Sequence, residues 1–146
     1  MALHSSRAPK HVFVSPTCAA LPRWLEAFPS AQVLAPAGIE SIASSVRLIW
    51  LRLQSDIAPL AQLERLGRRV SAVPVVVLSN EPSDSEALAL FAAGIRGYCN
   101  AHATSANLRQ VAKVVLEGGL WVGESLLQRL LVAAGTAAAN ASAAPL

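Results

Sequence analysis

The stretch 73–99, VPVVVLSNEPSDSEALALFAAGIRGYC, predicts a strand, a helix and a second strand. Four successive β-branched or leucine residues follow its proline, which is typical of a buried strand that ends at Ser79. Ser83, with Glu86 three residues later, is a capping-box pattern for a helix that ends at Gly94. The short apolar run after this glycine favours another strand. Two strands joined through a helix indicate a βαβ unit with parallel strands.

The same alternation continues towards both ends of the chain. Short apolar runs that end at turn residues predict strands, and apolar residues at helical spacing predict helices. We expect three further strands, at 11–14, 32–35 and 46–53, while the strand after Gly94, at 95–99, is the last of the five. We also expect further helices at 18–28, 39–43 (a single turn), 58–70, 106–117 and 123–134. These elements describe an α/β fold, a doubly wound five-stranded parallel sheet with an extra C-terminal helix.

The length of the chain fits one domain. The chain has 146 residues, and a domain usually has about 100 to 200. We expect an N-terminal extension at 1–10 and a single domain at 11–134. The tail at 135–146 is rich in alanine, asparagine and serine, so we expect it to be mostly disordered.

The composition excludes several classes of protein. Hydrophobic residues make up 53% of the chain and charged residues 14%, so the chain can bury enough apolar surface to fold. The net charge of +3 is too diffuse to predict direct binding to nucleic acid. Two cysteines far apart in the sequence predict neither a disulfide framework nor a zinc site. No stretch resembles a signal peptide or a membrane span, so we expect a cytoplasmic protein that binds neither a membrane nor a cofactor.

In open parallel sheets, ligands bind beyond the carboxyl ends of the strands. At those ends the sequence has only Ser15–Pro16, 50–52, Ser79 and 100–102, and none of these residues is a carboxylate. The sequence has no glycine-rich phosphate loop and no GxSxG nucleophile motif. We therefore expect no catalytic residue, no metal site and no enzymatic activity. A flavodoxin-like enzyme would need a cofactor loop that the sequence lacks.

Several motifs in the stretch 74–131 resemble the second half of response-regulator receiver domains, in particular the NarL/LuxR (FixJ-like) subgroup. The motifs are the hydroxyl residue that ends the strand at Ser79, the helix that leads into AAGIRGY, the helix that ends in EGGLW, and the closing helix with paired leucines. In the first half, IWLRLQ resembles the LLDLRLP segment of the family, and VFVSP resembles the end of its first strand. The resemblance implies a flavodoxin-like fold, in agreement with the periodicity.

The resemblance also implies a degenerate phosphorylation site. The phosphoacceptor aspartate of the family falls on Trp50, its acidic metal-binding pair on Ser15 and Pro16, and its lysine on Ala101, whereas its switch hydroxyl and switch aromatic are kept as Ser79 and Tyr98. Receivers transfer a phosphoryl group with a magnesium ion held by carboxylates and with a lysine that neutralises the phosphoryl oxygens. We therefore expect a pseudo-receiver without phosphoryl transfer. We also expect the Trp50 indole to fill the space of the metal.

The function of such a chain is expected to come from its surface. By resemblance, the interaction face comprises Glu86, Arg96, Tyr98, Arg109 and Lys113, as exposed groups. For Tyr98, packing beside Ser79 is an equally good interpretation. The expected partner is a sensor kinase, a response regulator or a transcription factor, and a homodimer is possible.

A second interpretation is a sensor of a small molecule or nucleotide messenger that binds in the emptied acid pocket, with Arg52 as the anion contact. Members of the subgroup commonly continue into a helix-turn-helix domain. The resemblance therefore suggests a regulator that has lost this domain.

Overall fold

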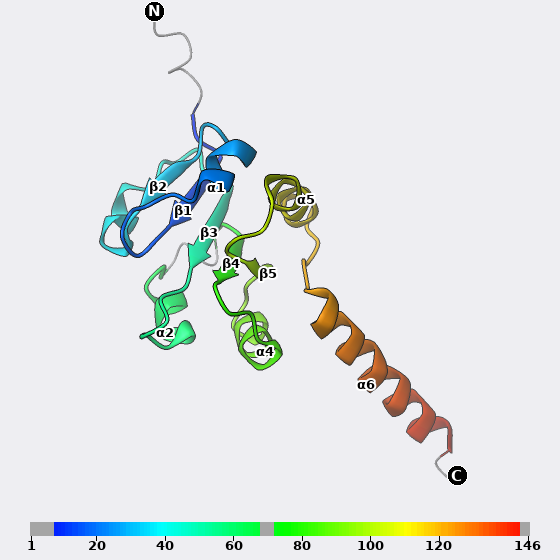
Figure 1. The fold of residues 1–146 in the computed structure, drawn as a ribbon. Coiled ribbons are helices and arrows are strands. Elements are labelled where there is room, and N and C mark those ends of the chain that lie inside the picture. The colour runs from blue at the N-terminus through cyan, green and yellow to red at the C-terminus, as the bar shows by residue number, and fades with distance from the viewer. Residues whose placement is uncertain (1–7, 68–71, 144–146) are drawn as a thin grey trace, which may run out of the picture.

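A computed structural model describes residues 8–67 and 72–143 of the chain (Figure 1). Its elements are β1 (His11–Val14), α1 (Pro22–Ala27), β2 (Gln32–Leu34), the 3₁₀ turn η2 (Pro36–Ser41), β3 (Leu48–Arg52), α2 (Pro59–Glu64), β4 (Val75–Ser79), α4 (Asp84–Ala92), β5 (Gly97–Asn100), α5 (Ser105–Leu116) and α6 (Glu124–Ala143). The five strands form one sheet in the order β2-β1-β3-β4-β5, and all neighbours are parallel. The predicted doubly wound sheet is confirmed.

The side chains of each strand alternate between two apolar layers. In one layer Phe13, Trp50 and Val76 pack with residues of α1 and α5. In the other, neighbouring residues such as Ile49 and Val77 pack with residues of α2 and α4. Figure 1 shows α1 and α5 on one face of the sheet and α2 and α4 on the other. Buried on both faces, the central strands have the near-continuous apolar sequences that the prediction relied on.

Some predicted boundaries differ from those in the structure. The helix predicted at 18–28 begins only at Pro22, because Cys18 has a positive φ of 58° and proline is favoured in the first helical turn. The strand predicted at 46–53 is shorter, at Leu48–Arg52. The helix predicted at 58–70 is α2, which ends at Glu64, and residues 68–70 of that prediction lie outside the described residues.

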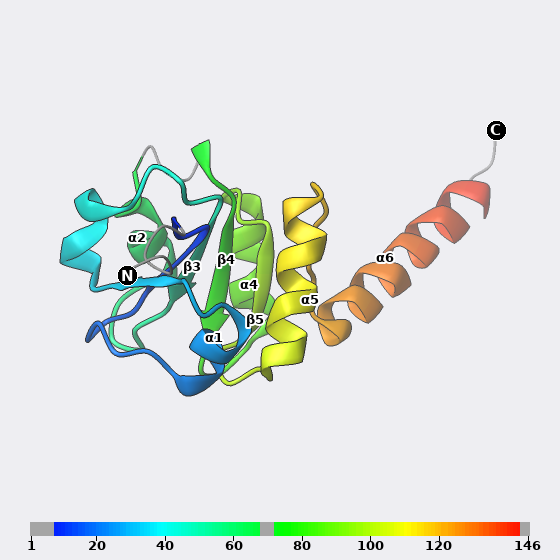
Figure 2. The same cartoon turned by 90° about the horizontal axis from the view of Figure 1, so that it is seen from above.

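The predicted extra C-terminal helix is present as α6, but it is longer than expected. It continues to Ala143 rather than ending near position 134, so most of the expected disordered tail is helical in the structure. Alanine has the highest helix propensity of all residues, which explains why the alanine-rich stretch continues the helix. Figures 1 and 2 show that α6 starts beside the sheet domain and projects away from it. No helix in the described part of the chain is both long and apolar enough to span a membrane.

Candidate functional site

The structure brings the predicted pocket residues to one edge of the sheet. Ser15 follows β1, Ser79 ends β4, and Ala101 follows β5, where its backbone nitrogen donates a hydrogen bond to the Ser79 carbonyl over 2.9 Å. Ser15, Ser79 and Ala101 are all buried, and Pro16 is half-buried. Trp50 lies further back, in the middle of β3. This edge is therefore closed by packed side chains.

The residue that fills this edge is Trp24, which the sequence had not singled out. Trp24 lies on α1, is fully buried, and donates from its indole nitrogen to the Ala101 carbonyl over 3.4 Å. The adjacent Arg23 donates to the carbonyl of His102, which ties α1 to the same loop a second time. The Arg52 guanidinium lies 5.8 Å from the centre of the Trp24 ring, a cation–π distance. Two side chains of α1 thus cover the ends of β3 and β5.

The expectation that the Trp50 indole fills the space of the metal is wrong in position. The indole nitrogen of Trp50 donates to Nδ1 of His11, at the start of β1, over 3.0 Å. The indole therefore extends towards the opposite edge of the sheet. Burial, with a smaller contribution from Lys10, lowers the pKa of His11 to about 4. The neutral imidazole is the form that can accept this hydrogen bond.

Aromatic rings fill the space between the two edges. Phe13 stacks on Trp24 with ring centres 4.6 Å apart and on Trp50 at 5.3 Å, with interplanar angles of 9° and 11°. Phe28 stacks on His11 at 3.8 Å. Aromatic pairs of this kind stabilise a fold by more than their buried area alone would give. The layer under α1 is thus filled by packed aromatic rings.

The residues at this edge do not fit the magnesium ion that the fold implies. Ser15, Pro16 and Ala101 offer a hydroxyl, a proline ring and a methyl group, whereas magnesium prefers carboxylate oxygens. The buried Ser15 hydroxyl has no hydrogen-bond partner among the described residues. Within residues 8–67 and 72–143, no group of three or more histidines, cysteines or carboxylates is placed to hold a metal ion. One hydroxyl cannot replace a pair of carboxylates, so these residues support no metal-dependent step.

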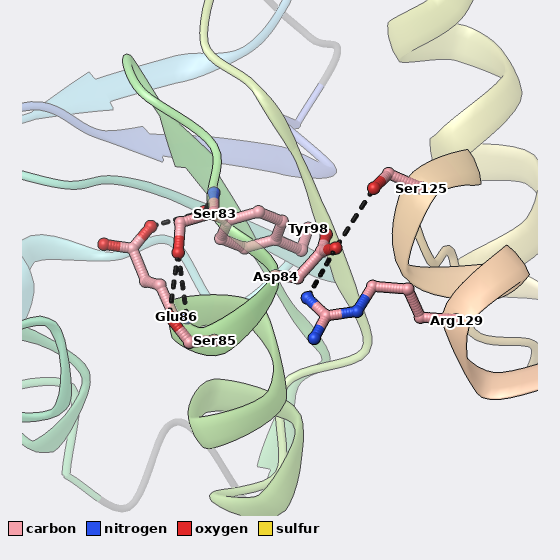
Figure 3. A network of polar contacts seen from close by, with 7 residues as sticks. All are labelled: Ser83, Asp84, Ser85, Glu86, Tyr98, Ser125 and Arg129. Atoms are coloured by element: carbon pink, nitrogen blue, oxygen red, sulfur yellow. Dashed lines mark hydrogen bonds and ion pairs between the residues drawn. The ribbon is translucent and has the colours of Figure 1, made fainter. Parts of the chain in front are cut away.

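Tyr98, the residue expected at the switch position, is buried and hydrogen-bonded inside the domain. Tyr98 is only 4% exposed, and its hydroxyl donates to the Glu86 carboxylate and accepts from the Ser83 backbone nitrogen over 2.9 Å (Figure 3). Burial, followed by the hydrogen bond to Glu86, raises the pKa of Tyr98, while Ser83 and Ser79 oppose the shift. The expectation of an exposed Tyr98 is therefore wrong, and the alternative of packing is confirmed. The reason is that Glu86 and Ser83 satisfy its hydroxyl inside the fold.

The capping box at the start of α4 forms only in part. The Ser83 hydroxyl accepts from the Glu86 backbone nitrogen over 3.3 Å, as the motif predicts. The Glu86 side chain, however, binds Tyr98 instead of reaching back to the Ser83 nitrogen. The Tyr98 hydroxyl takes that second position of the motif. This exchange joins the start of α4 to β5.

The same turn of α4 also anchors α6, which the sequence did not predict. One oxygen of Asp84 accepts from the Ser125 hydroxyl over 3.0 Å and from the Arg129 guanidinium over 3.1 Å (Figure 3). Beside these contacts, Leu126 is buried in the core. Asp84 is an acid in the first turn of α4, and no local sequence pattern pairs it with residues about forty positions later. The first two turns of α6 are thus docked on the domain.

The predicted interaction face is only partly exposed. Arg109 and Lys113 lie exposed on α5, whereas Glu86 and Arg96 are half-buried. Arg96 donates to the Gly118 carbonyl over 2.6 Å, so the structure uses it to hold the loop after α5. Exposed leucines were not predicted there: a hollow of about 280 Å³ between α4 and α6 is lined in part by Leu88, Phe91, Leu120, Leu126 and Leu130.

Structural comparison finds response-regulator receiver domains among the similar solved structures. A two-component response regulator of the LuxR family from Aurantimonas sp. SI85-9A1 has a TM-score of 0.60 and 16% identity, over 83% of this chain and 94% of that chain. The isolated REC domain of RcsB from Salmonella enterica serovar Typhimurium, in the presence of phosphomimetic BeF3-, has a TM-score of 0.60 and 13% identity, over 83% and 98%. RcsB in a complex with DNA has a TM-score of 0.61 and 12% identity, over 83% and 67%.

Sequence comparison gives no match: no family model matches the chain, and no curated protein matches it significantly. At 12 to 16% identity, the structural likeness shows the fold alone. The chain therefore has the fold of response-regulator receiver domains, with a C-terminal helix added to it.

Proposed function

We propose that the chain is a phosphorylation-independent signalling module, a stand-alone degenerate receiver that regulates a two-component or transcriptional partner through protein–protein contact. The single observation that carries this proposal is the Trp24 indole bonded to the Ala101 carbonyl at the edge where a receiver would be phosphorylated. Phosphoryl transfer needs charged groups and a metal at that edge. Here the buried Trp24 side chain occupies this edge and is hydrogen-bonded to the loop after β5.

The surface that remains for a partner lies on α4, α5 and α6. Arg109 and Lys113 are separated by one helical turn on α5, and both are exposed. Leu88 on α4 and Leu130 on α6 are 44% and 43% exposed and line the same hollow. We infer that the partner presents acidic residues to the cations of α5 and apolar residues to the leucines of α4 and α6.

The proposal is tested with an affinity capture from the host lysate, using the wild type and an Arg109→Glu/Lys113→Glu variant. The matched control is Arg47→Glu/Arg65→Glu, which makes the same charge change at two exposed arginines outside α4, α5 and α6. We expect a sensor kinase, a response regulator or a transcription factor that the α5 variant loses and the control keeps.

The chain alone is first incubated with or without acetyl phosphate and magnesium and then freed of both, and the purified captured protein is titrated with each preparation. Under the proposal the dissociation constant is the same in both conditions, and the chain gains no phosphoryl group in its mass spectrum. A phosphorylated chain, or binding that requires acetyl phosphate, contradicts the proposal. Equal loss of binding in both charge variants contradicts the assignment to α5.

The second interpretation, a ligand sensor in the emptied acid pocket, has no support in the structure. Trp24 fills that edge, and the anion contact expected of Arg52 is already engaged, since its guanidinium donates to the Asn80 side chain over 3.1 Å. We therefore do not retain it as a function.

A further inference from the structure

A cavity of about 820 Å³ opens at the other edge of the sheet, where β1 and β3 begin. Its walls come from Lys10 and His11 at the start of β1, from the end of α1 around Phe28, and from the segment 44–47 that leads into β3. This volume lies within the range of small-molecule sites in proteins, about 300 to 1,000 Å³. The cavity is separate from the phosphorylation-site edge and from the α4–α6 hollow.

The charge of this cavity is positive. Lys10 and Arg47 are both exposed, and neither makes an ion pair with any residue in the described part of the chain. Among the described residues, no carboxylate lines the cavity. Two unneutralised cations on facing segments attract an anion.

The two cation-bearing segments are held together by the backbone. The carbonyl of Lys10 accepts from the backbone nitrogens of Arg47 and Leu48 over 2.7 and 3.2 Å. The Ser45 hydroxyl donates to the Pro9 carbonyl over 2.6 Å. The spacing of the two backbones is therefore fixed before any ligand arrives, which lowers the entropic cost of binding.

His11 adds a directed donor to the cavity. Its Nδ1 accepts from the Trp50 indole, so the neutral ring carries its proton on Nε2. His11 lines the cavity, and its Nε2 makes no hydrogen bond with any described residue. The other part of the lining is apolar and includes Ala27, Phe28 and Pro29. Cationic groups, a neutral N–H donor and an aromatic wall thus meet in one place.

We propose that this cavity binds a small organic anion with a flat apolar body, with the charged end between Lys10 and Arg47 and the body against Phe28. The Nε2–H of His11 donates to the ligand in this arrangement. The contact is transmitted to Trp50, because the same imidazole accepts the hydrogen bond of the Trp50 indole. The proposal is independent of the function proposed above, since it uses a different edge of the sheet.

The experiment follows the indole N–H signals of the full ¹⁵N-labelled chain by NMR, with the Trp50 signal assigned from its loss in Trp50→Phe. The probes are AMP and salicylate, with adenosine and salicylamide as uncharged counterparts and inorganic phosphate as a charge without a flat body. We expect a saturable shift of the Trp50 signal with AMP or salicylate. The affinity for the uncharged counterparts and for phosphate is expected to be lower by about tenfold or more.

Two double variants locate the site. Lys10→Gln/Arg47→Gln weakens binding about tenfold or more, because it removes both charge-assisted contacts. Arg65→Gln/Lys113→Gln removes the same net charge at exposed positions elsewhere and leaves binding unchanged. The proposal is overturned if neither anion gives a saturable shift, if phosphate or the uncharged counterparts bind equally well, or if both double variants weaken binding to the same extent.

Discussion

The Trp24 indole donates a hydrogen bond to the backbone carbonyl of Ala101, a residue 77 positions later in the chain. Both residues are fully buried. By resemblance, Ala101 stands where receivers have a lysine, and the loop there uses its carbonyl to hold a side chain of α1. The end of β5 and the helix α1 are thereby fixed to each other, so this edge of the sheet is a part of the core.

The contribution of Trp24 to stability can be measured directly. We expect Trp24→Ala to lower the free energy of unfolding by about 3–5 kcal/mol, because it leaves a cavity beside Phe13. Trp24→Phe keeps an aromatic ring and loses the bond to Ala101, so we expect a smaller cost. Urea unfolding followed by circular dichroism gives both values. A cost below about 1 kcal/mol for Trp24→Ala would show that Trp24 is not part of the core.

The five strands could be predicted because each is a short apolar run closed by turn residues. Such a signal is local, and it also shows which strands are buried on both faces, as in the run from Leu48 to Arg52. The pocket residues could be located for the same reason, since parallel strands end at a common edge. The missing carboxylates of the candidate site were therefore visible in the sequence.

The positions of the Trp24 and Trp50 side chains at the ends of the strands could not be predicted. The alternation of a strand says which face Trp50 is on, but the direction of its indole along the strand depends on an acceptor, His11, on the neighbouring strand. In the sequence, Trp24 is only one of several apolar residues in the helix predicted at 18–28. The docking of α6 could not be predicted either, because Asp84 and Arg129 are far apart in the sequence and come into contact only in the folded chain.

Trp50→Asp is expected to leave the chain unable to accept a phosphoryl group. The substitution restores one carboxylate, while Ser15, Pro16 and Ala101 still lack the metal-binding acids and the lysine. Incubation with acetyl phosphate and magnesium, followed by mass spectrometry of the intact protein, measures this. Trp50→Asn is the matched control for folding. A mass increase of one phosphoryl group in Trp50→Asp alone would contradict the degenerate site.

The burial of His11 predicts a dependence of stability on pH. His11 has a pKa of about 4 in the folded chain and about 6.5 when unfolded, so the unfolded chain binds more protons between these values. Stability is therefore full above pH 6.5 and is lost as the pH falls towards 4. The shift from 6.5 to about 4 corresponds to at most about 3–4 kcal/mol, and we expect about 1–2 kcal/mol because the ring is partly exposed.

His11→Gln supplies the control for this dependence. A glutamine carbonyl can accept from the Trp50 indole and does not titrate, so the variant should lose less stability between pH 6.5 and 4 than the wild type. Urea unfolding at several pH values compares the two. Parallel curves for the two proteins would show that His11 is not the group responsible.

The network around Tyr98 predicts a cost for removing its hydroxyl. Tyr98→Phe leaves the Glu86 carboxylate and the Ser83 backbone nitrogen without their partner, and we expect a loss of about 1–3 kcal/mol in the free energy of unfolding. Glu86→Gln keeps an oxygen that can accept from Tyr98, so we expect it to cost less. Thermal unfolding of both variants tests this order. The reverse order would show that the Tyr98 hydroxyl is not held by Glu86.

Polar contacts of Asp84 with Ser125 and Arg129 help to dock α6 on the domain, and they are weak because solvent screens them. Arg129 is 67% exposed at its side chain, so its ion pair with Asp84 is worth about 0.2–1 kcal/mol, and Asp84→Asn should barely change global stability. Its effect should appear locally, because it weakens both the Arg129 and the Ser125 contacts. We expect faster backbone hydrogen exchange in the first turns of α6, measured by mass spectrometry.

Residues Leu130, Leu131 and Val132 are exposed, so α6 has little packing to support it between Arg129 and position 136. Isolated helices of this length are marginal in water, and we expect this part to exchange rapidly already in the wild type. The matched control is Arg109→Gln on α5, which leaves every contact of Asp84 in place. If Asp84→Asn and Arg109→Gln give the same exchange over the first turns of α6, the Leu126 contact alone must hold the helix on the domain. If exchange rises only in Asp84→Asn, the polar contacts to α4 also hold it, and a partner that binds Asp84 could release α6.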